Sequence, residues 1–196
     1  MLHSLGSDPD ASLCLELDLL TLCEQPLEGS DLASGKDCYV CGSAYRDGVL
    51  LLDFYPARRR AALEIAPPQV FRGFLSSHAL VSGSAIVGEG TVVLANALVS
   101  TGASIGAFCK VGIGAQIHHN AILEDFVTVA PGAVVLGGAV LRTGAILGAG
   151  SVLRQERTVG PNTYIGLASA VVKDIPGGVL AYGNPARPVR DFVIEQ

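Results

Sequence analysis

Between residues 81 and 171, every sixth residue of the chain is a branched aliphatic residue. The series has sixteen positions, all of them Val, Ile or Leu, and Leu75 extends it one step toward the N-terminus. A fixed period of this length is the signature of a repeat architecture. We therefore expect most of the chain to fold as stacked copies of one short unit rather than around a conventional globular core.

The other positions of the six-residue unit predict how the chain turns. When the aliphatic residue is counted as position one, position five is small in almost every unit, with Arg157 as an exception, and position four favours Gly or Asn. Gly and Asn enter the left-handed backbone conformation at low cost. Position four therefore predicts a corner, and the branched residues between corners predict short β-strands.

Three corners close a triangular coil of eighteen residues. Successive coils would stack at the ordinary spacing of neighbouring strands, about 4.8 Å. This stacking predicts one interior ladder made of Val81, Val99, Ile117, Val135, Leu153 and Val171. The expected fold is mainly β: a parallel β-helix of roughly five to six coils over residues 75–178, without a loop insertion, and a tail over residues 179–196.

Residues 1–74 do not share the period, and we expect them to form a small α/β lobe. Residues 37–42 predict a short strand, and residues 58–65 predict a helix that Pro67 and Pro68 stop. Residues 69–75 predict a further strand that leads into the first coil.

Two features of this segment leave alternatives open. Residues 13–23 are apolar enough for a helix or a strand. Cys38 and Cys41 form a CxxC motif, but Cys14 and Cys23 are nine residues apart and give no second pair at metal-ligand spacing. Two cysteines in a buried strand are therefore favoured over a zinc or redox site.

Composition excludes several classes of partner. The net charge is −5 and the charged fraction is 16%, which argues against a nucleic-acid partner. No apolar run approaches the ~20 residues of a membrane span, and the first residues lack the pattern of a signal peptide. Five cysteines are too few and too scattered for a disulfide framework. We therefore expect a cytoplasmic protein with no membrane and no nucleic-acid partner.

The end of the repeat carries the most specific motif. Residues 171–176 read Val-Val-Lys-Asp-Ile-Pro, and residues 182–187 read Tyr-Gly-Asn-Pro-Ala-Arg. With residues 84–92, 117–127 and 130–138, they resemble the hexapeptide-repeat acyltransferases, in particular the bacillosamine-type sugar N-acetyltransferases and the sialic acid O-acetyltransferases. This resemblance, over roughly residues 70–192, implies that the β-helix is left-handed and that a Rossmann-like lobe precedes it.

In that family the N-terminal lobe holds a nucleotide-sugar. Here residues 25–60 resemble only the second half of the lobe, so the lobe is truncated. The family's opening Gly-rich turn, which would hold phosphate through backbone N–H groups, is absent, and Ser76-Ser77 replaces a His-Pro pair. We expect nucleotide binding by this lobe to be weak or altered.

Acetyl transfer from a thioester requires a base that works near neutral pH, and histidine suits this task. The chain has four histidines: His3, His78, His118 and His119. The six-residue frame places His118 and His119 beside a corner, outside the core. The resemblance implies that His119 is the general base and that His118 is its neighbour.

The residue after the base is an acid in the family and Asn120 in this chain. An asparagine can fix an imidazole tautomer through a hydrogen bond, but it offers no charge to an imidazolium. Asn120 also fits position four as an ordinary corner residue. Glu124 or Asp125 could supply the missing charge.

The resemblance further implies that acetyl-CoA is the co-substrate and that it runs along the β-helix between two subunits of a homotrimer. The positions that it touches correspond to Thr128, Gly137, Ala149 and Leu167. Gly137 begins a pair of glycines, where a ligand could approach a backbone N–H that stabilises the tetrahedral oxyanion. Lys173, Arg187 and Arg190 could meet the CoA phosphates.

The first functional hypothesis is acetyl-CoA-dependent transfer of an acetyl group to the amino group of a nucleotide-linked amino sugar, in lipopolysaccharide or capsule biosynthesis. Sugar O-acetylation is the alternative within the same class. A non-catalytic β-helix scaffold is a second hypothesis. A zinc lyase of the carbonic-anhydrase type is a third, and it is disfavoured because His78, His118 and His119 lack the spacing of a three-histidine site. We expect no metal.

Overall fold

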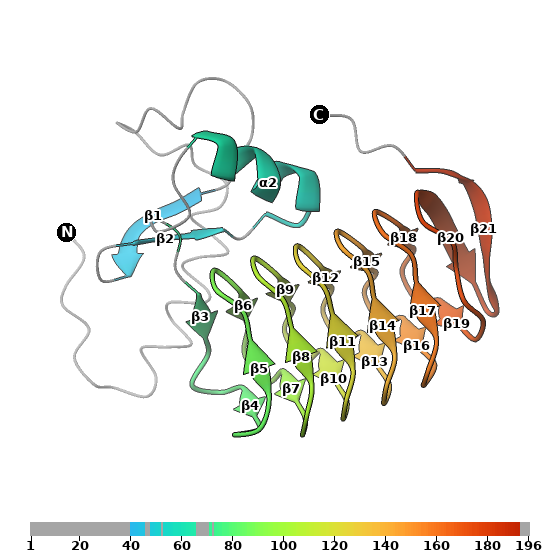
Figure 1. The fold of residues 1–196 in the computed structure, drawn as a ribbon, viewed down its shortest axis with the longest axis horizontal. Helices are drawn as coiled ribbons and strands as arrows, with labels where there is room; N and C mark the ends of the chain where they lie inside the picture. The colour runs from blue at the N-terminus through green and yellow to red at the C-terminus, as the bar shows by residue number, and fades with distance from the viewer. Residues whose placement is uncertain (1–39, 46–47, 52, 66–70, 72, 193–196) are drawn as a thin grey trace.

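The computed structural model describes residues 40–45, 48–51, 53–65, 71 and 73–192 (Figure 1). From residue 74 onward the chain winds into a three-sided parallel β-helix. Each strand pairs with the strand one coil away, as Val81 pairs with Val99 and Ile117 with Val135. This register confirms the coil of eighteen residues and the interior ladder that the six-residue period predicts.

The coils build three parallel sheets. The first sheet contains β4 (Leu80–Val81), β7 (Leu98–Val99), β10 (Gln116–Ile117), β13 (Val134–Val135), β16 (Val152–Leu153) and β19 (Ala170–Val171). The second contains β5 (Ile86–Val87), β8 (Ser104–Ile105), β11 (Ile122–Leu123), β14 (Val140–Leu141) and β17 (Thr158–Val159). The third contains β3 (Phe74–Leu75), β6 (Val92–Val93), β9 (Lys110–Val111), β12 (Thr128–Val129), β15 (Ile146–Leu147), β18 (Tyr164–Ile165), β20 (Val179–Gly183) and β21 (Ala186–Asp191).

Three corners join these sheets, and each is named here by what it carries. The histidine corner, between the first and second sheets, comprises residues 100–103, 118–121, 136–139 and 154–157. The helix corner, between the second and third sheets, comprises residues 106–109, 124–127, 142–145 and 160–163. The apolar corner, between the third and first sheets, comprises residues 112–115, 130–133, 148–151 and 166–169.

The core is the inside of the coil. Position-one residues such as Ile117 and Val135 are completely buried, and so are the position-five alanines Ala121 and Ala139. Alternate residues of a strand point to opposite faces, so one aliphatic residue per strand fills the interior while its neighbour faces outward. Position five, where the chain bends, carries a small side chain in almost every coil.

Position four has positive φ almost throughout the β-helix, as its Gly and Asn residues predict. Phe108, Phe126, Glu156 and Ala168 take the same conformation, with φ between 53° and 60°. This region is unfavourable for side chains that carry a β-carbon. The stacked neighbours therefore impose the corner geometry even where the local residue does not favour it.

The described part of the N-terminal segment is an antiparallel hairpin of β1 (Val40–Tyr45) and β2 (Gly48–Leu51), followed by α2 (Pro56–Ile65). The predicted strand over residues 37–42 overlaps β1, and the predicted helix over residues 58–65 is confirmed within α2. Residues 13–23 and Cys38 lie outside the described residues. The antiparallel hairpin does not confirm a Rossmann-like lobe, whose strands are parallel.

Helix α2 is anchored on the helix corner by one buried side chain. Arg59 is fully buried, and its guanidinium donates hydrogen bonds to the carbonyl oxygens of Phe108 (3.0 Å) and Phe126 (2.6 Å) and to Oγ1 of Thr128 (2.9 Å). Desolvation lowers the pKa of Arg59 to about 10, so the group stays charged at neutral pH. These acceptors compensate the cost of burying the cation.

Aromatic and cationic side chains complete this contact. The rings of Phe108 and Phe126 stack with centroids 5.6 Å apart, and the guanidinium of Arg60 lies 5.1 Å from the Phe126 centroid. Nη1 of Arg60 also donates to Oδ1 of Asn162 at 3.1 Å. The helix corner is therefore filled by structural contacts over four successive coils.

The regular frame ends two residues early. Tyr164 pairs with Leu180 and Val159 with Ile175, so the last coil contains sixteen residues instead of eighteen. The antiparallel hairpin of β20 and β21 then closes the C-terminal end (Figure 1). No helix within the described residues is long and apolar enough to cross a bilayer.

Candidate active site

His119 lies at the histidine corner, between β10 and β11, with an exposed side chain. Its imidazole rests on the backbone of Gly137, one coil further along. A methyl group at Gly137 would lie 2.5 Å from Cε1 and 2.6 Å from Nε2 of the ring. The place of the ring therefore depends on the absence of a side chain at Gly137.

One of the two glycine N–H groups beneath this ring is available as a hydrogen-bond donor. The N–H of Gly138 donates to the carbonyl of His119 at 3.0 Å, whereas the N–H of Gly137 has no hydrogen bond to any described residue. At the equivalent place on the helix corner, carboxylates occupy the N–H groups of Ala107 and Thr143. The histidine corner thus presents an imidazole beside an unoccupied donor.

The neighbours of His119 point elsewhere. The ring of His118 is half-buried, with Nε2 3.3 Å from Oε1 of Gln116. Asn120 has φ of 57°, and its Oδ1 lies over Gly102 in the preceding coil, 2.5 Å from where a methyl group there would be. The His119 ring lies on the following coil. The structure therefore makes Asn120 a corner residue and gives it no contact that would orient the His119 ring.

The interpretation that Glu124 or Asp125 supplies charge to His119 is wrong within one subunit, because both lie on the helix corner. Glu124 accepts hydrogen bonds from Arg142 (2.6 Å) and from the N–H of Thr143 (2.8 Å). Desolvation alone would raise the pKa of Glu124, but these hydrogen bonds outweigh it and hold the pKa below its ordinary value. Oδ1 of Asp125 accepts from the N–H of Ala107 at 2.8 Å.

The structure divides the predicted cofactor residues among several places. Lys173 follows the histidine corner at the same position as His119, three coils further along, which corresponds to about 14 Å. Ala149 and Leu167 are exposed on the apolar corner, and Leu167 is 74% exposed. Arg187 and Arg190 lie on β21, at the end of the third sheet.

Thr128 does not belong to this set of exposed residues. Its side chain is fully buried, and its hydroxyl accepts from Arg59 and donates to the carbonyl of Phe54 at 2.9 Å. The structure therefore places Thr128 in the anchor of α2 rather than on an open ligand surface. Sequence spacing alone could not show this, because the contact comes from outside the repeat.

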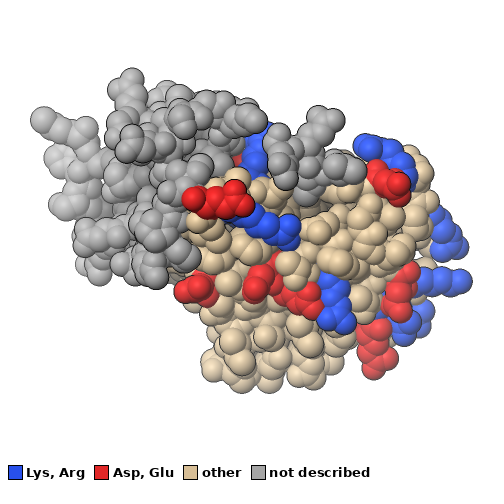
Figure 2. Space-filling model, turned by 45° about the horizontal axis from the view of Figure 1, so that its top comes forward, with Lys and Arg blue, Asp and Glu red and all other residues tan. Residues whose placement is uncertain are grey.

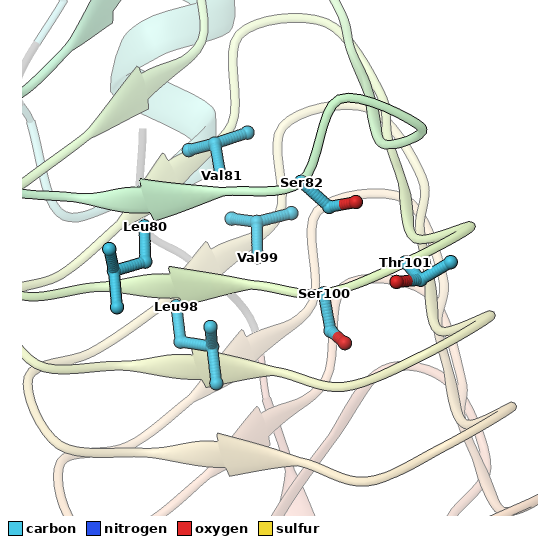
Figure 3. A pocket seen from close by; sticks show the side chains of 7 residues that line it. All are labelled: Leu80, Val81, Ser82, Leu98, Val99, Ser100 and Thr101. Carbon is cyan, nitrogen blue, oxygen red and sulfur yellow. The ribbon is translucent and has the colours of Figure 1, made fainter.

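A shallow depression of about 290 Å³ lies on the first sheet, one coil before His119 (Figure 3). It is lined by Leu80, Val81, Ser82, Leu98, Val99, Ser100 and Thr101. Ser100 and Thr101 directly precede His118 and His119 in the stack of coils. The lining is uncharged, with hydroxyl groups on the side that faces the histidine corner.

The sheets on either side of the histidine corner expose apolar side chains. On the first sheet Leu80 and Val152 are exposed, and on the second sheet Ile86 and Ile122 are exposed. Position-six side chains of the third sheet are mostly buried instead. Exposed apolar surface of this kind marks an interaction site in many proteins.

Charge is distributed unevenly along the β-helix. Figure 2 shows most Lys and Arg side chains of this face toward the C-terminal end, where Asp and Glu side chains lie among them, while Asp and Glu also lie on coils nearer the N-terminal part. The exposed cations of this end include Arg154, Lys173, Arg187 and Arg190. Among the described residues, no group of His, Cys, Asp and Glu side chains could hold a metal ion.

No family model and no curated protein matches the chain, but solved structures do. The acetyltransferase domain of PglB from Neisseria gonorrhoeae superposes with a TM-score of 0.68 and 33% identity, over 71% of this chain and 69% of that chain. The same domain has been solved in complex with acetyl coenzyme A. The three-sided β-helix and this likeness together define a hexapeptide-repeat acetyltransferase. The chain belongs to the family of the PglB acetyltransferase domain, the bacillosamine-type sugar acetyltransferases.

Two further structures extend the comparison. A variant of perosamine N-acetyltransferase from Caulobacter crescentus, with a histidine replaced by asparagine and in complex with CoA and GDP-perosamine, has a TM-score of 0.69 and 26% identity, over 72% of this chain and 69% of that chain. WeeI from Acinetobacter baumannii has a TM-score of 0.69 and 24% identity, over 75% and 74% of the two chains, and shows the shared fold.

Two features of the site were not recognised in the sequence. One is the contact of the His119 ring with the backbone of Gly137, called here the seat of the imidazole, and the other is the depression beside Ser100 and Thr101. Both become visible when the sequence is read in steps of eighteen residues, which places Thr101, His119 and Gly137 in one column.

Proposed function

We propose that the protein transfers an acetyl group from acetyl-CoA to the amino group of a nucleotide-linked amino sugar, with His119 as the general base. The single observation that carries this proposal is the exposed His119 imidazole resting on Gly137, beside an N–H that no described residue occupies. The family of the chain and the ligands named for its structural neighbours support the same reaction.

In this proposal His119 takes a proton from the sugar amine as the nitrogen attacks the thioester carbonyl. The new C–N bond forms as the carbonyl oxygen gains negative charge, which the N–H of Gly137 stabilises. The C–S bond then breaks, and the proton held by His119 passes to the leaving thiolate. The products are the N-acetylated sugar and free CoA, so atoms and protons balance.

The residues around the histidine corner fit both substrates. Lys173, about 14 Å along the same corner, can meet the phosphates of CoA when the thioester lies beside His119. The depression next to Thr101 offers hydroxyl groups and leucine side chains to the polar and apolar sides of a sugar ring. We propose that it accepts the sugar.

We further propose that the site is shared between subunits of a homotrimer. The histidine corner and the apolar corner with Ala149 and Leu167 lie on opposite edges of the first sheet, so the corners of two neighbouring copies can face each other around a threefold axis. The exposed Leu80 and Val152 of this sheet would then be covered. Sedimentation should give a trimer at micromolar concentration; a monomer would contradict the shared site.

The reaction is tested by supplying acetyl-CoA and a panel of UDP-, GDP- and dTDP-linked amino sugars and measuring thiol release. At least one amino sugar should accept an acetyl group on nitrogen. Transfer to a hydroxyl would favour O-acetylation, and the absence of both transfer and CoA binding would favour a scaffold. We propose that the reaction serves surface-glycan biosynthesis in the cytoplasm, as predicted from the sequence.

A further inference from the structure

The imidazole of His119 becomes a cation whenever it holds the proton of an incoming nucleophile. A carboxylate nearby stabilises such a cation. The residue that follows His119 is the neutral Asn120, whose amide lies over Gly102 on the other side. Within one subunit, a charge that assists His119 must therefore come from another coil.

The neighbouring column of the histidine corner, which contains Asn120 and Gly138, offers one suitable group. Glu156 lies at position four, one coil beyond Gly138, and its N–H donates to the carbonyl of Gly137 at 3.1 Å. The stem of its side chain lies beside Gly138: a methyl group at Gly138 would lie 3.6 Å from Cγ of Glu156. The same glycine pair thus receives the His119 ring from one side and the stem of Glu156 from the other.

The remaining charged groups of the corner do not compete for this role. Asp174 accepts from the N–H of Thr158 at 2.9 Å and lies 3.7 Å from Arg157. The carboxylate of Glu156 has no ion pair or hydrogen bond within the described part of the chain. Arg154 lies two coils from His119 at position two, on the side of Leu136 rather than of Gly138. Lys173 is one coil further away.

We propose that Glu156 is a positioning residue for His119: its carboxylate, on the coil beyond the glycine pair that holds the ring, stabilises the protonated imidazole through space. The inference rests on the proposed role of His119 as the base.

The test is the pair Glu156→Gln and Glu156→Asp, with Glu64→Gln on the exposed face of α2 as the control. Glu156→Gln removes the charge and keeps the shape. We expect the acid limb of the kcat/KM profile to move to lower pH by about half a unit, because the neutral base then survives to lower pH, and the plateau rate to fall about threefold to tenfold. The effect should shrink in 1 M salt, where an exposed charge is screened. Glu156→Asp should restore part of it.

The second readout is the NMR titration of the His119 ring protons in the protein without substrates, assigned by comparison with His119→Ala. Glu156→Gln should move the midpoint in the same direction as the acid limb, and Glu64→Gln should leave it unchanged. If the midpoint is the same in Glu156→Gln and in the unaltered protein, the inference about Glu156 is overturned even when His119→Ala is inactive. If His119→Ala is active, it is the proposed base that fails.

Discussion

The histidine corner and the helix corner are built on the same repeat but are finished in opposite ways. Both turn at position four with positive φ, and both stack at the spacing of one coil. On the helix corner, Phe108 and Phe126 fill the turn and Arg59 occupies their carbonyl groups. On the histidine corner, Gly137 and Gly138 leave the turn open beneath His119. The repeat determines the position of each corner side chain. The size of the neighbouring side chains one coil away determines whether that position is packed or open to a ligand.

This contrast predicts that substitutions on the histidine corner change activity and leave stability intact, and that substitutions on the helix corner do the reverse. The largest effect is expected at His119 itself. His119→Ala should lower kcat/KM by about 10²–10⁴-fold because general-base assistance is lost, with acetyl-CoA binding nearly unchanged. His118→Ala is the matched control and should cost much less. If the His119→Ala protein is fully active, His119 is not the general base. If the His118→Ala protein is the inactive one, His118 is the base instead.

On the helix corner the largest effect is expected at Arg59. Arg59→Ala leaves several buried carbonyl groups without a donor and should destabilise the docking of α2 by about 3 kcal/mol or more. Hydrogen exchange of the α2 amides and Tm at fixed protein concentration measure this loss. Arg60→Ala, which removes a cation–π contact at the surface and one hydrogen bond to Asn162, should cost less, about 1 kcal/mol. Equal effects of the two substitutions would show that the buried anchor is not what holds the helix.

A smaller effect on activity is expected at the seat of the imidazole. Gly137→Ala places a methyl group 2.5 Å from the His119 ring, so the ring must rotate away, while the backbone at this residue accepts alanine. Displacement of a reacting group by about 1 Å can cost up to about 10²-fold, and we expect kcat/KM to fall by about 10–10²-fold with Tm nearly unchanged. Gly83→Ala, in the same column with open space around it, is the control. Unchanged activity in Gly137→Ala would refute the role of this seat.

The smallest effect is expected at Asn120. Asn120→Asp keeps the corner, because aspartate also tolerates positive φ, and it adds a negative charge next to His119. Stabilisation of the imidazolium should keep the base protonated to higher pH, so the acid limb of the kcat/KM profile should move upward by about half a pH unit. A downward movement would contradict the electrostatic account of this corner.

The six-residue period was sufficient to predict the coil, the interior ladder and the place of His119 outside the core, because each follows from local spacing. It could not show that Thr128 is buried, since Arg59 and Phe54 reach it from outside the repeat. The period also could not predict the partners of Glu124. These are Arg142 and Thr143, which lie one coil away on the helix corner and not on the corner of His119. To predict contacts between coils, residues eighteen apart must be compared at every corner position as well as in the interior.

The most direct test of the histidine corner as the site of acetyl transfer is a crystal structure of the protein with acetyl-CoA. We predict that the thioester lies beside His119, with its carbonyl oxygen about 3 Å from the N–H of Gly137, and that Ala149 and Leu167 of a second copy line the rest of the ligand. A thioester bound away from His119, on the helix corner or along β21, would contradict the account.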